Sequence, residues 1–180
     1  SVDLNYRKKL WTEAQAQETM RPLMGHVDVV IANEEDLQSV LGVEVPETDV
    51  TSGQLNIDGY REAAERVTRE FGPRMVAITL RESLSASDNG WSAVLWDAET
   101  RTMYRSQHYD VRLVDRVGGA DSFPAGLIYG LLERRSPEAA LEFAVAASAL
   151  KQTIPGDFNR ISVDEADRLS AGDASGRVQR

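Results

Sequence analysis

Short β-branched runs alternate with longer helical stretches through the first half of the chain. The runs at 2–4, 27–31 and 75–79 are short and apolar, and they predict strands. The stretch at 58–71 repeats apolar residues every three or four positions, which is the spacing of one helix face, and the stretch at 10–24 is also helical in pattern. This half is therefore predicted to run strand, helix, strand, helix, strand.

The second half is predicted to begin with two strands and to end in helices. Strands at 91–96 and 102–109, joined by a polar turn, are typical of a hairpin at a sheet edge. Helices are expected from about 121 to 134 and from 136 to 149, and the second is rich in alanine, which implies close packing of its backbone. A capping box at 162–165 opens a short last helix.

This order of strands and helices predicts an α/β fold with three layers, in which a mostly parallel sheet carries helices on both faces. Such sheets bind ligands beyond the carboxyl ends of their strands. Candidate functional residues therefore lie in the segments that follow the strands, which are 5–7, 33–36, 79–84 and 118–121.

Composition narrows the classes of partner. The 180 residues carry a net charge of −9, which disfavours nucleic acid, because its phosphates are neutralised by clustered Lys and Arg. No apolar run approaches the roughly 20 residues of a membrane span. With no cysteine and two histidines, a zinc site is disfavoured, whereas Mg²⁺ carried in with a nucleotide is compatible. We expect a cytoplasmic protein that binds small molecules and neither nucleic acid nor membrane.

A glycine pair, Gly118 and Gly119, turns the chain directly into a predicted helix, with Asp121 at its head. Free backbone N–H groups at such a turn form an anion site. Asp121 would then lie beside a transferring phosphoryl group and accept the proton of an attacking hydroxyl. The alternative is that Asp121 only caps the helix. The Gly-Lys-Ser/Thr ending of the Walker A loop is absent, which excludes phosphate binding by that route.

The segment DRVGGADSFPAGL at 115–127 resembles the anion-hole signature of the ribokinase-like carbohydrate kinases. The resemblance implies that the backbone of Gly118, Gly119 and Ala120 receives the developing charge. It also implies that Asp121 deprotonates the sugar hydroxyl that attacks the γ-phosphate of ATP. Ala120 stands where the family normally has glycine, and an alanine would be strained there if the position required a positive φ.

The likeness runs from about Asp3 to Asn159 and is strongest to the 2-keto-3-deoxygluconate kinases. In the segment DLNYR at 3–7, it implies that Arg7 reaches the acid group of the sugar, to which a guanidinium fork is suited. Asn5 would face the nucleotide phosphates. Without the resemblance, Arg7 reads as a solvated surface charge.

Two further segments match the family, and each has a plainer alternative. Asp36 lies in a region that the family places near magnesium and phosphates, although an acidic helix cap explains it equally well. The element with Thr79, Arg81 and Ser83 would border the nucleotide, or be a solvated loop.

Two later positions complete the set. Ser148, in the alanine-rich helix, would face the adenine pocket, or serve packing alone. Asp157, in a Gly-Asp pair, would lie near the substrate, or be an ordinary loop residue.

Residues 1–169 are predicted to form the C-terminal, nucleotide-binding part of a sugar kinase domain, and 170–180 a flexible tail. The N-terminal sugar-binding segment and β lid of the family are not seen in this sequence. A truncated form would therefore have weak activity by itself, while the full-length protein is expected to be a homo-oligomer.

The function expected is ATP- and Mg²⁺-dependent phosphorylation of a sugar or sugar acid at a primary hydroxyl, with 2-keto-3-deoxygluconate as the leading substrate. The alternatives are a fructokinase- or ribokinase-type sugar kinase, and a non-catalytic domain that binds a nucleotide or a sugar.

Overall fold

The chain is described here from a computed structural model, which covers residues 1–46, 57–83, 85–133 and 135–172. Two compact units can be distinguished, one formed by 1–80 with 94–104 and the other by 81–93 with 105–180. Two long strands, β3 (Met75–Ser83) and β4 (Asp88–Asp97), each contribute residues to both units.

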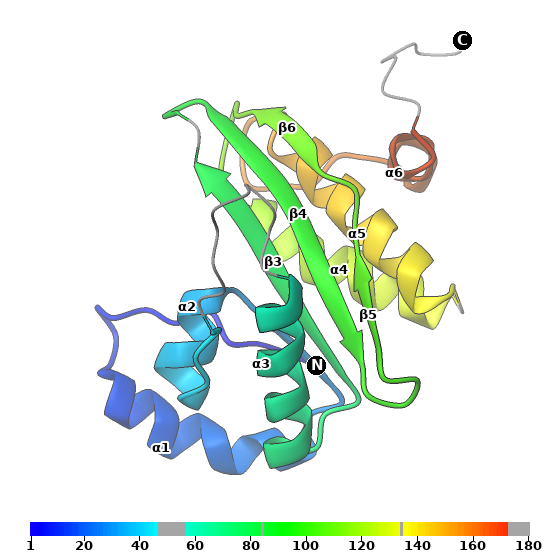
Figure 1. Ribbon diagram of the computed structural model, residues 1–180. Coiled ribbons are helices and arrows are strands. Elements are labelled where there is room, and N and C mark those ends of the chain that lie inside the picture. The colour runs from blue at the N-terminus through cyan, green and yellow to red at the C-terminus, as the bar shows by residue number, and fades with distance from the viewer. Residues whose placement is uncertain (47–56, 84, 134, 173–180) are drawn as a thin grey trace, which may run out of the picture. The chain divides into compact units, whose positions relative to one another are not determined.

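Six strands form one sheet in the order β1-β2-β3-β4-β5, and β6 pairs with β4 (Figure 1). β1 (Val2–Asp3) is parallel to β2 (Val29–Ala32), and β2 is parallel to β3. β6 (Tyr109–Arg112) is antiparallel to β4, with Trp91 opposite Tyr109. The predicted α/β fold is confirmed. The sheet is mixed, because strands that follow one another through short turns pair antiparallel.

The first unit builds its core around α3, whose apolar face is buried as its spacing predicts. Four side chains of that face lie in one apolar cluster with Val30, Ile78 and Trp96: Tyr60, Ala63, Ala64 and Val67. The helical elements of this unit are α1 (Glu13–Leu23), η1 (Met24–His26), α2 (Glu34–Asp36), η2 (Leu37–Leu41) and α3 (Ile57–Phe71).

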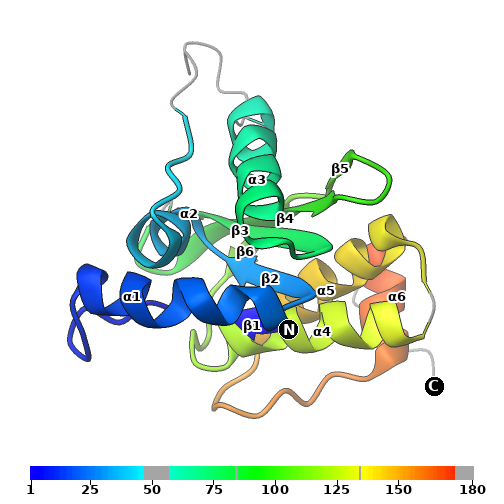
Figure 2. The ribbon, with the colours of Figure 1, turned by 90° about the horizontal axis from the view of Figure 1, so that it is seen from below.

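The second unit contains α4 (Gly119–Leu132), α5 (Pro137–Lys151) and α6 (Val163–Ser170). α4 and α5 lie side by side in both ribbon views (Figures 1 and 2). A Cβ atom on Gly126 would lie 3.0 Å from the Cα of Ala144, and one on Gly130 would lie 2.8 Å from the Cα of Ala140. The close backbone packing expected of the alanine-rich helix is confirmed.

Several predicted boundaries differ from the structure, and β3 and β4 are longer than the strands expected at 75–79 and 91–96. The strand expected at 102–109 is divided into β5 (Thr102–Arg105) and β6, because the chain leaves the regular strand at 106–108. There the Ser106 hydroxyl accepts a hydrogen bond from the Ala93 amide at 3.0 Å and donates one to the Gln107 carbonyl. The helix expected from 121 begins at Gly119.

The capping box that opens α6 is confirmed, since Ser162 and Glu165 exchange hydrogen bonds. Most of the predicted tail, 173–180, lies outside the described residues.

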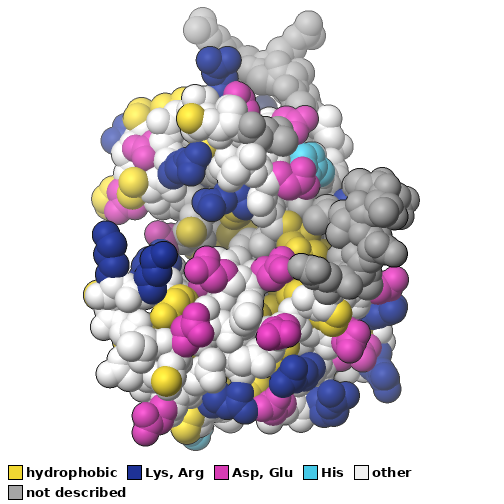
Figure 3. Space-filling view, turned by 60° about the vertical axis from the view of Figure 1, so that its left-hand side comes forward, with side chains coloured by type: hydrophobic (Ala, Val, Ile, Leu, Met, Phe, Trp, Pro, Cys, Tyr) yellow, Lys and Arg dark blue, Asp and Glu magenta, His cyan; other side chains and the backbone are white. Residues whose placement is uncertain are grey.

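Among the described helices, none is long and apolar enough to cross a membrane. On the face drawn in Figure 3, acidic and basic side chains are interspersed over the described part of the surface.

Candidate active site

The glycine turn before α4 has the geometry that its sequence suggested. Gly118 has a left-handed backbone with φ of +75° and is the residue that caps α4, without a side-chain hydrogen bond. A Cβ atom at this position would lie 2.3 Å from the carbonyl oxygen of Asp157. The position therefore requires glycine for its dihedral angle and for space.

Asp121 is the third residue of α4, after Gly119 and Ala120. Ala120 is not among the non-glycine residues with a positive φ, so an alanine is accommodated there without strain. The Asp121 carboxylate is exposed and accepts no hydrogen bond from any described residue. Because Gly118 is the cap, the structure does not support the capping alternative for Asp121.

Three backbone amides at this helix start donate no hydrogen bond to any described residue. They are the amides of Gly118, Ala120 and Asp121. The Gly119 amide, by contrast, donates to the Arg116 carbonyl at 3.2 Å. Free N–H groups at a helix N-terminus carry partial positive charge and attract anions. The amides without an acceptor thus differ by one residue from the set predicted to form the anion hole, which was Gly118, Gly119 and Ala120, and the anion hole itself stays a prediction.

A pocket of about 280 Å³ opens beside Asp121. Asn159 donates to the Ser122 hydroxyl at 3.1 Å, and that hydroxyl donates to the Gly118 carbonyl at 2.8 Å. The bond from Asn159 joins the loop after α5 to the start of α4. The pocket is lined by Gly118, Asp121, Ser122, Ala125, Asp157, Phe158 and Asn159. The structure therefore brings Asp121 and Asp157 together, as the sequence led us to expect.

The hydrogen bonds of Asp36, in the first unit, hold the backbone around it in place. Its two carboxylate oxygens accept hydrogen bonds from the amides of Tyr6, at 2.8 Å, and Asn33, at 3.3 Å. The Asn33 side chain accepts from the Asp36 amide in return, which completes a capping box. Burial raises the pKa of Asp36, and the two amide bonds oppose that rise.

The described residues contain no group of three or more acidic or histidine side chains placed to hold a metal. A magnesium ion needs few protein carboxylates when it is held by nucleotide phosphates and water. A role for Asp36 beside such an ion stays a prediction.

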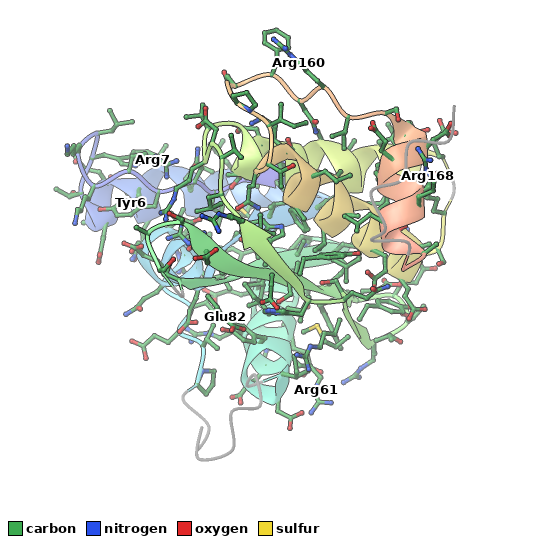
Figure 4. The ribbon with its side chains drawn as sticks, turned by 90° about the horizontal axis from the view of Figure 1, so that it is seen from above. Tyr6, Arg7, Arg61, Glu82, Arg160 and Arg168 are labelled. Atoms are coloured by element: carbon green, nitrogen blue, oxygen red, sulfur yellow. The ribbon has the colours of Figure 1, made fainter. Side chains whose placement is uncertain are left out.

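Asn5 and Arg7 lie in the segment between β1 and α1, and Arg7 is drawn next to Tyr6 in Figure 4. Asn5 has a positive φ of +40°, a conformation that asparagine tolerates better than most residues. The exposed Arg7 side chain donates to the Tyr6 carbonyl at 2.9 Å and forms no ion pair with a described carboxylate. Both residues belong to the first unit and Asp121 to the second, so a shared site stays a prediction.

The remaining predicted nucleotide residues differ in exposure. The Thr79 hydroxyl donates to the Ala32 carbonyl at 3.4 Å, and Arg81 and Ser83 are exposed at the end of β3. Ser148 is fully buried, and its hydroxyl accepts from the indole of Trp91 at 2.5 Å.

The Ser148 hydroxyl also donates to the Val145 carbonyl at 3.1 Å, which completes its bonding. The structure thus favours packing, the alternative that the sequence left open for Ser148.

Two residues near the glycine turn were given no role by sequence reasoning. Asp115 accepts hydrogen bonds from the amides of Val117 and Gly156, and these bonds lower its pKa. Lys151, the last residue of α5, is fully buried beside Gly118. The signal for Asp115 was its place at the start of the motif. Lys151 stood out only as the single lysine after Lys9.

Residues 1–159 match the family described as pfkB family carbohydrate kinase. The chain is 30% identical to a 2-dehydro-3-deoxygalactonokinase of Haloferax volcanii over 97% of its length and 48% of that protein. It is 29% identical to a 2-dehydro-3-deoxygluconokinase of Thermoproteus tenax, covering 94% of the chain and 45% of that protein.

Among solved structures, a 2-dehydro-3-deoxygluconokinase of Thermotoga maritima is 46% identical, with a TM-score of 0.86 over 94% of this chain and 50% of that one. The chain therefore spans about half the length of the relatives that it matches. Since the family match covers most of the chain and includes the glycine turn with Asp121, the chain belongs to the pfkB family of carbohydrate kinases.

Proposed function

We propose that the protein carrying this chain transfers the terminal phosphoryl group of ATP to a hydroxyl of a 2-keto-3-deoxy sugar acid, with Asp121 as the general base. The single observation that carries this proposal is the exposed Asp121 carboxylate, which lines a pocket at the start of α4 beside free backbone amides.

Each part of this arrangement has a place in the reaction. The substrate oxygen attacks the terminal phosphorus of ATP, its proton passes to the Asp121 carboxylate, and the bond to the departing ADP oxygen breaks. The amides of Gly118, Ala120 and Asp121, which have no acceptor among the described residues, support this proposal because such amides would stabilise negative charge on the transferring group. Because the Asp121 carboxylate accepts no hydrogen bond from a described residue, it is available to accept the proton.

Family membership supports ATP as the phosphoryl donor, with Mg²⁺ as the usual companion of its phosphates. When bound, the ion supplies charge neutralisation at the phosphate oxygens. This chain's own residues contribute the amides and the carboxylate described above.

The choice of a sugar acid is supported by the names of the relatives, which include kinases of 2-dehydro-3-deoxygluconate and of its galactonate counterpart. The guanidinium of Arg7 is exposed and forms no ion pair with a described carboxylate, although its charge acts on Asp36, and it is suited to the substrate carboxylate. Thr79, Arg81, Ser83 and Asn5 remain the proposed nucleotide side, and Asp157 the proposed substrate side.

A coupled assay of ADP release by the full protein that carries this chain tests the proposal. The substrates are 2-keto-3-deoxygluconate, 2-keto-3-deoxygalactonate, fructose and ribose. We expect turnover with at least one of the two sugar acids and little with the neutral sugars.

The Asp121→Asn variant should lose at least about 10³-fold in kcat and still bind ATP by calorimetry, because removing a general base leaves the nucleotide contacts in place. Turnover by Asp121→Asn at the wild-type rate would rule out the base. Preference for ribose or fructose would assign a different substrate class, and a wild-type protein without turnover would support the non-catalytic alternative.

A further inference from the structure

Lys151 is a charged side chain in a place where charge is costly. It is fully buried, and it is one of the largest side chains in the described structure to be so. Its ammonium donates one hydrogen bond, to the Ile154 carbonyl at 3.3 Å, and forms no ion pair with a described carboxylate. An ammonium has three N–H donors, and burying it without a partner is strongly unfavourable. Such a group is expected to be compensated by a further negative charge.

The position of Lys151 links it to the glycine turn. Its Cε atom lies 3.1 Å from the point that a Cβ atom on Gly118 would occupy, so the end of the side chain lies against that residue. Gly118 is the residue that leads into α4, and its amide is one of the three with no acceptor among the described residues. The buried cation therefore lies beside the turn that carries these amides.

Hydrogen bonds also connect the glycine turn before α4 with the loop after α5. The Asp115 carboxylate accepts from the Val117 amide at 3.0 Å and from the Gly156 amide at 2.8 Å, which ties the turn to the loop after α5. The carbonyl of Lys151 accepts from the Ile154 amide at 3.0 Å, so both ends of this lysine hold the same loop residue. The charge of Lys151 also acts on Asp115, where it helps to lower the pKa.

We propose that Lys151 is a positioning residue for phosphoryl transfer, whose buried ammonium holds the Gly118 turn against the loop at 152–157 and supplies a fixed positive charge behind the anion site. Phosphoryl transfer depends on positioning and on preorganised charge. A cation fixed before the substrate arrives costs no reorganisation when negative charge develops on the transferring group. This inference rests on the proposed function, and it adds a residue that touches neither substrate.

The first test compares Lys151→Met with Lys9→Met in the full protein. Methionine keeps most of the length and volume of lysine and removes the charge, and Lys9 is an exposed lysine of the first unit. For Lys151→Met we expect a fall in kcat of about tenfold to hundredfold, with an unchanged KM for the sugar acid and a melting temperature near that of the wild type. Lys9→Met should behave as the wild type. An unchanged kcat in Lys151→Met would overturn the proposal.

A second test separates charge from packing. Lys151→Ala lacks three methylene groups and the ammonium. Added n-propylammonium has the shape and the charge of the missing group, whereas n-propanol has a similar shape without the charge. We expect n-propylammonium to restore kcat severalfold and n-propanol to have no effect. Equal rescue by both compounds would assign Lys151 to packing. If neither variant folds, the lysine belongs to the core, and the proposal is again overturned.

The proposal can fail separately from the function on which it rests. If the wild-type protein phosphorylates no sugar acid, calorimetric titration with ATP and with ADP still reports on the charge behind the turn. We expect Lys151→Met to weaken the binding of ATP about tenfold and to leave the binding of ADP nearly unchanged, because the proposed function places the terminal phosphoryl group nearest the turn. Equal effects on the two nucleotides would overturn the role of Lys151.

Discussion

The backbone carbonyl of Asp157 fills the space that a side chain on Gly118 would need. A Cβ atom on Gly118 would lie 2.3 Å from that carbonyl oxygen and 3.0 Å from the Asp157 carboxylate. The loop after α5 is thereby held against the turn that leads to Asp121. Any residue larger than glycine at 118 must push the two apart, which changes the pocket that Asp121 and Asp157 line.

Replacing Gly118 by alanine should therefore damage activity more than stability. The positive φ alone costs about 1–2 kcal/mol, and the overlap with Asp157 adds displacement of the loop. We expect kcat/KM to fall at least about hundredfold, since small displacements in a site are costly. Steady-state kinetics and thermal denaturation measure the two effects.

Gly72→Ala is the matched control, because Gly72 has a φ of +85° with no atom within 4 Å of its added Cβ. Gly72→Ala should lose a similar amount of stability through its unfavourable backbone angle and keep its kcat/KM. Equal losses of activity in the two variants would contradict a special role for the contact with Asp157.

Local sequence signals predicted the elements well and the contacts between distant residues poorly. The capping box of α6 and the buried face of α3 depend on residues within a turn or two of each other, so spacing reveals them. The division between β5 and β6 depends on the contact of Ser106 with Ala93, which no local pattern encodes. The same holds for α4, whose start was predicted two residues late because the left-handed angle of Gly118 was not foreseen.

The candidate site follows the same rule. The motif around Asp121 is continuous in sequence, and the structure places its residues together at one helix start. The state of Ser148, in contrast, is decided by Trp91, 57 positions away. The burial of Lys151 likewise depends on how α5 packs against the glycine turn. No local sequence pattern therefore predicts that this lysine is buried.

Ser148→Ala should reduce stability and leave nucleotide binding intact. The substitution leaves the indole N–H of Trp91 without its acceptor in the interior, which costs about 1–3 kcal/mol. Chemical denaturation measures that loss, and calorimetry with ATP measures affinity. Adding Trp91→Phe removes the stranded donor, so the double variant should recover part of the loss. A large fall in ATP affinity with unchanged stability would instead return Ser148 to the nucleotide site.

Asp115→Asn should remove an acid-sensitive part of the protein's stability. Hydrogen bonds from the amides of Val117 and Gly156 lower the pKa of Asp115 below its ordinary 3.8. The folded protein thus keeps this carboxylate ionised at a pH where the unfolded chain has bound a proton. The resulting stabilisation is complete above the unfolded pKa and is lost as the pH falls through the lower, folded one.

Melting temperatures between pH 7 and pH 3 test this sign. Wild type should exceed Asp115→Asn at neutral pH, and the difference should shrink below about pH 4. The exposed Glu44, changed to glutamine, is the control and should track the wild type. A constant difference at every pH would mean that Asp115 acts through packing.

Arg7→Met should weaken the binding of the sugar acid without slowing the phosphorylation of the bound substrate. An exposed guanidinium that forms no ion pair with a described carboxylate is free to bind a substrate carboxylate. A charge-assisted hydrogen bond contributes about 1.5–3 kcal/mol, so KM for the sugar acid should rise about tenfold to hundredfold, with kcat and the KM for ATP nearly constant. Arg7→Lys keeps the charge and loses the two-pronged geometry, and its KM should fall between those of wild type and Arg7→Met. The same substitutions should leave any residual turnover of neutral sugars unchanged, because those lack the carboxylate. A uniform loss across acidic and neutral sugars would show that Arg7 supports the fold of its loop and not the choice of substrate.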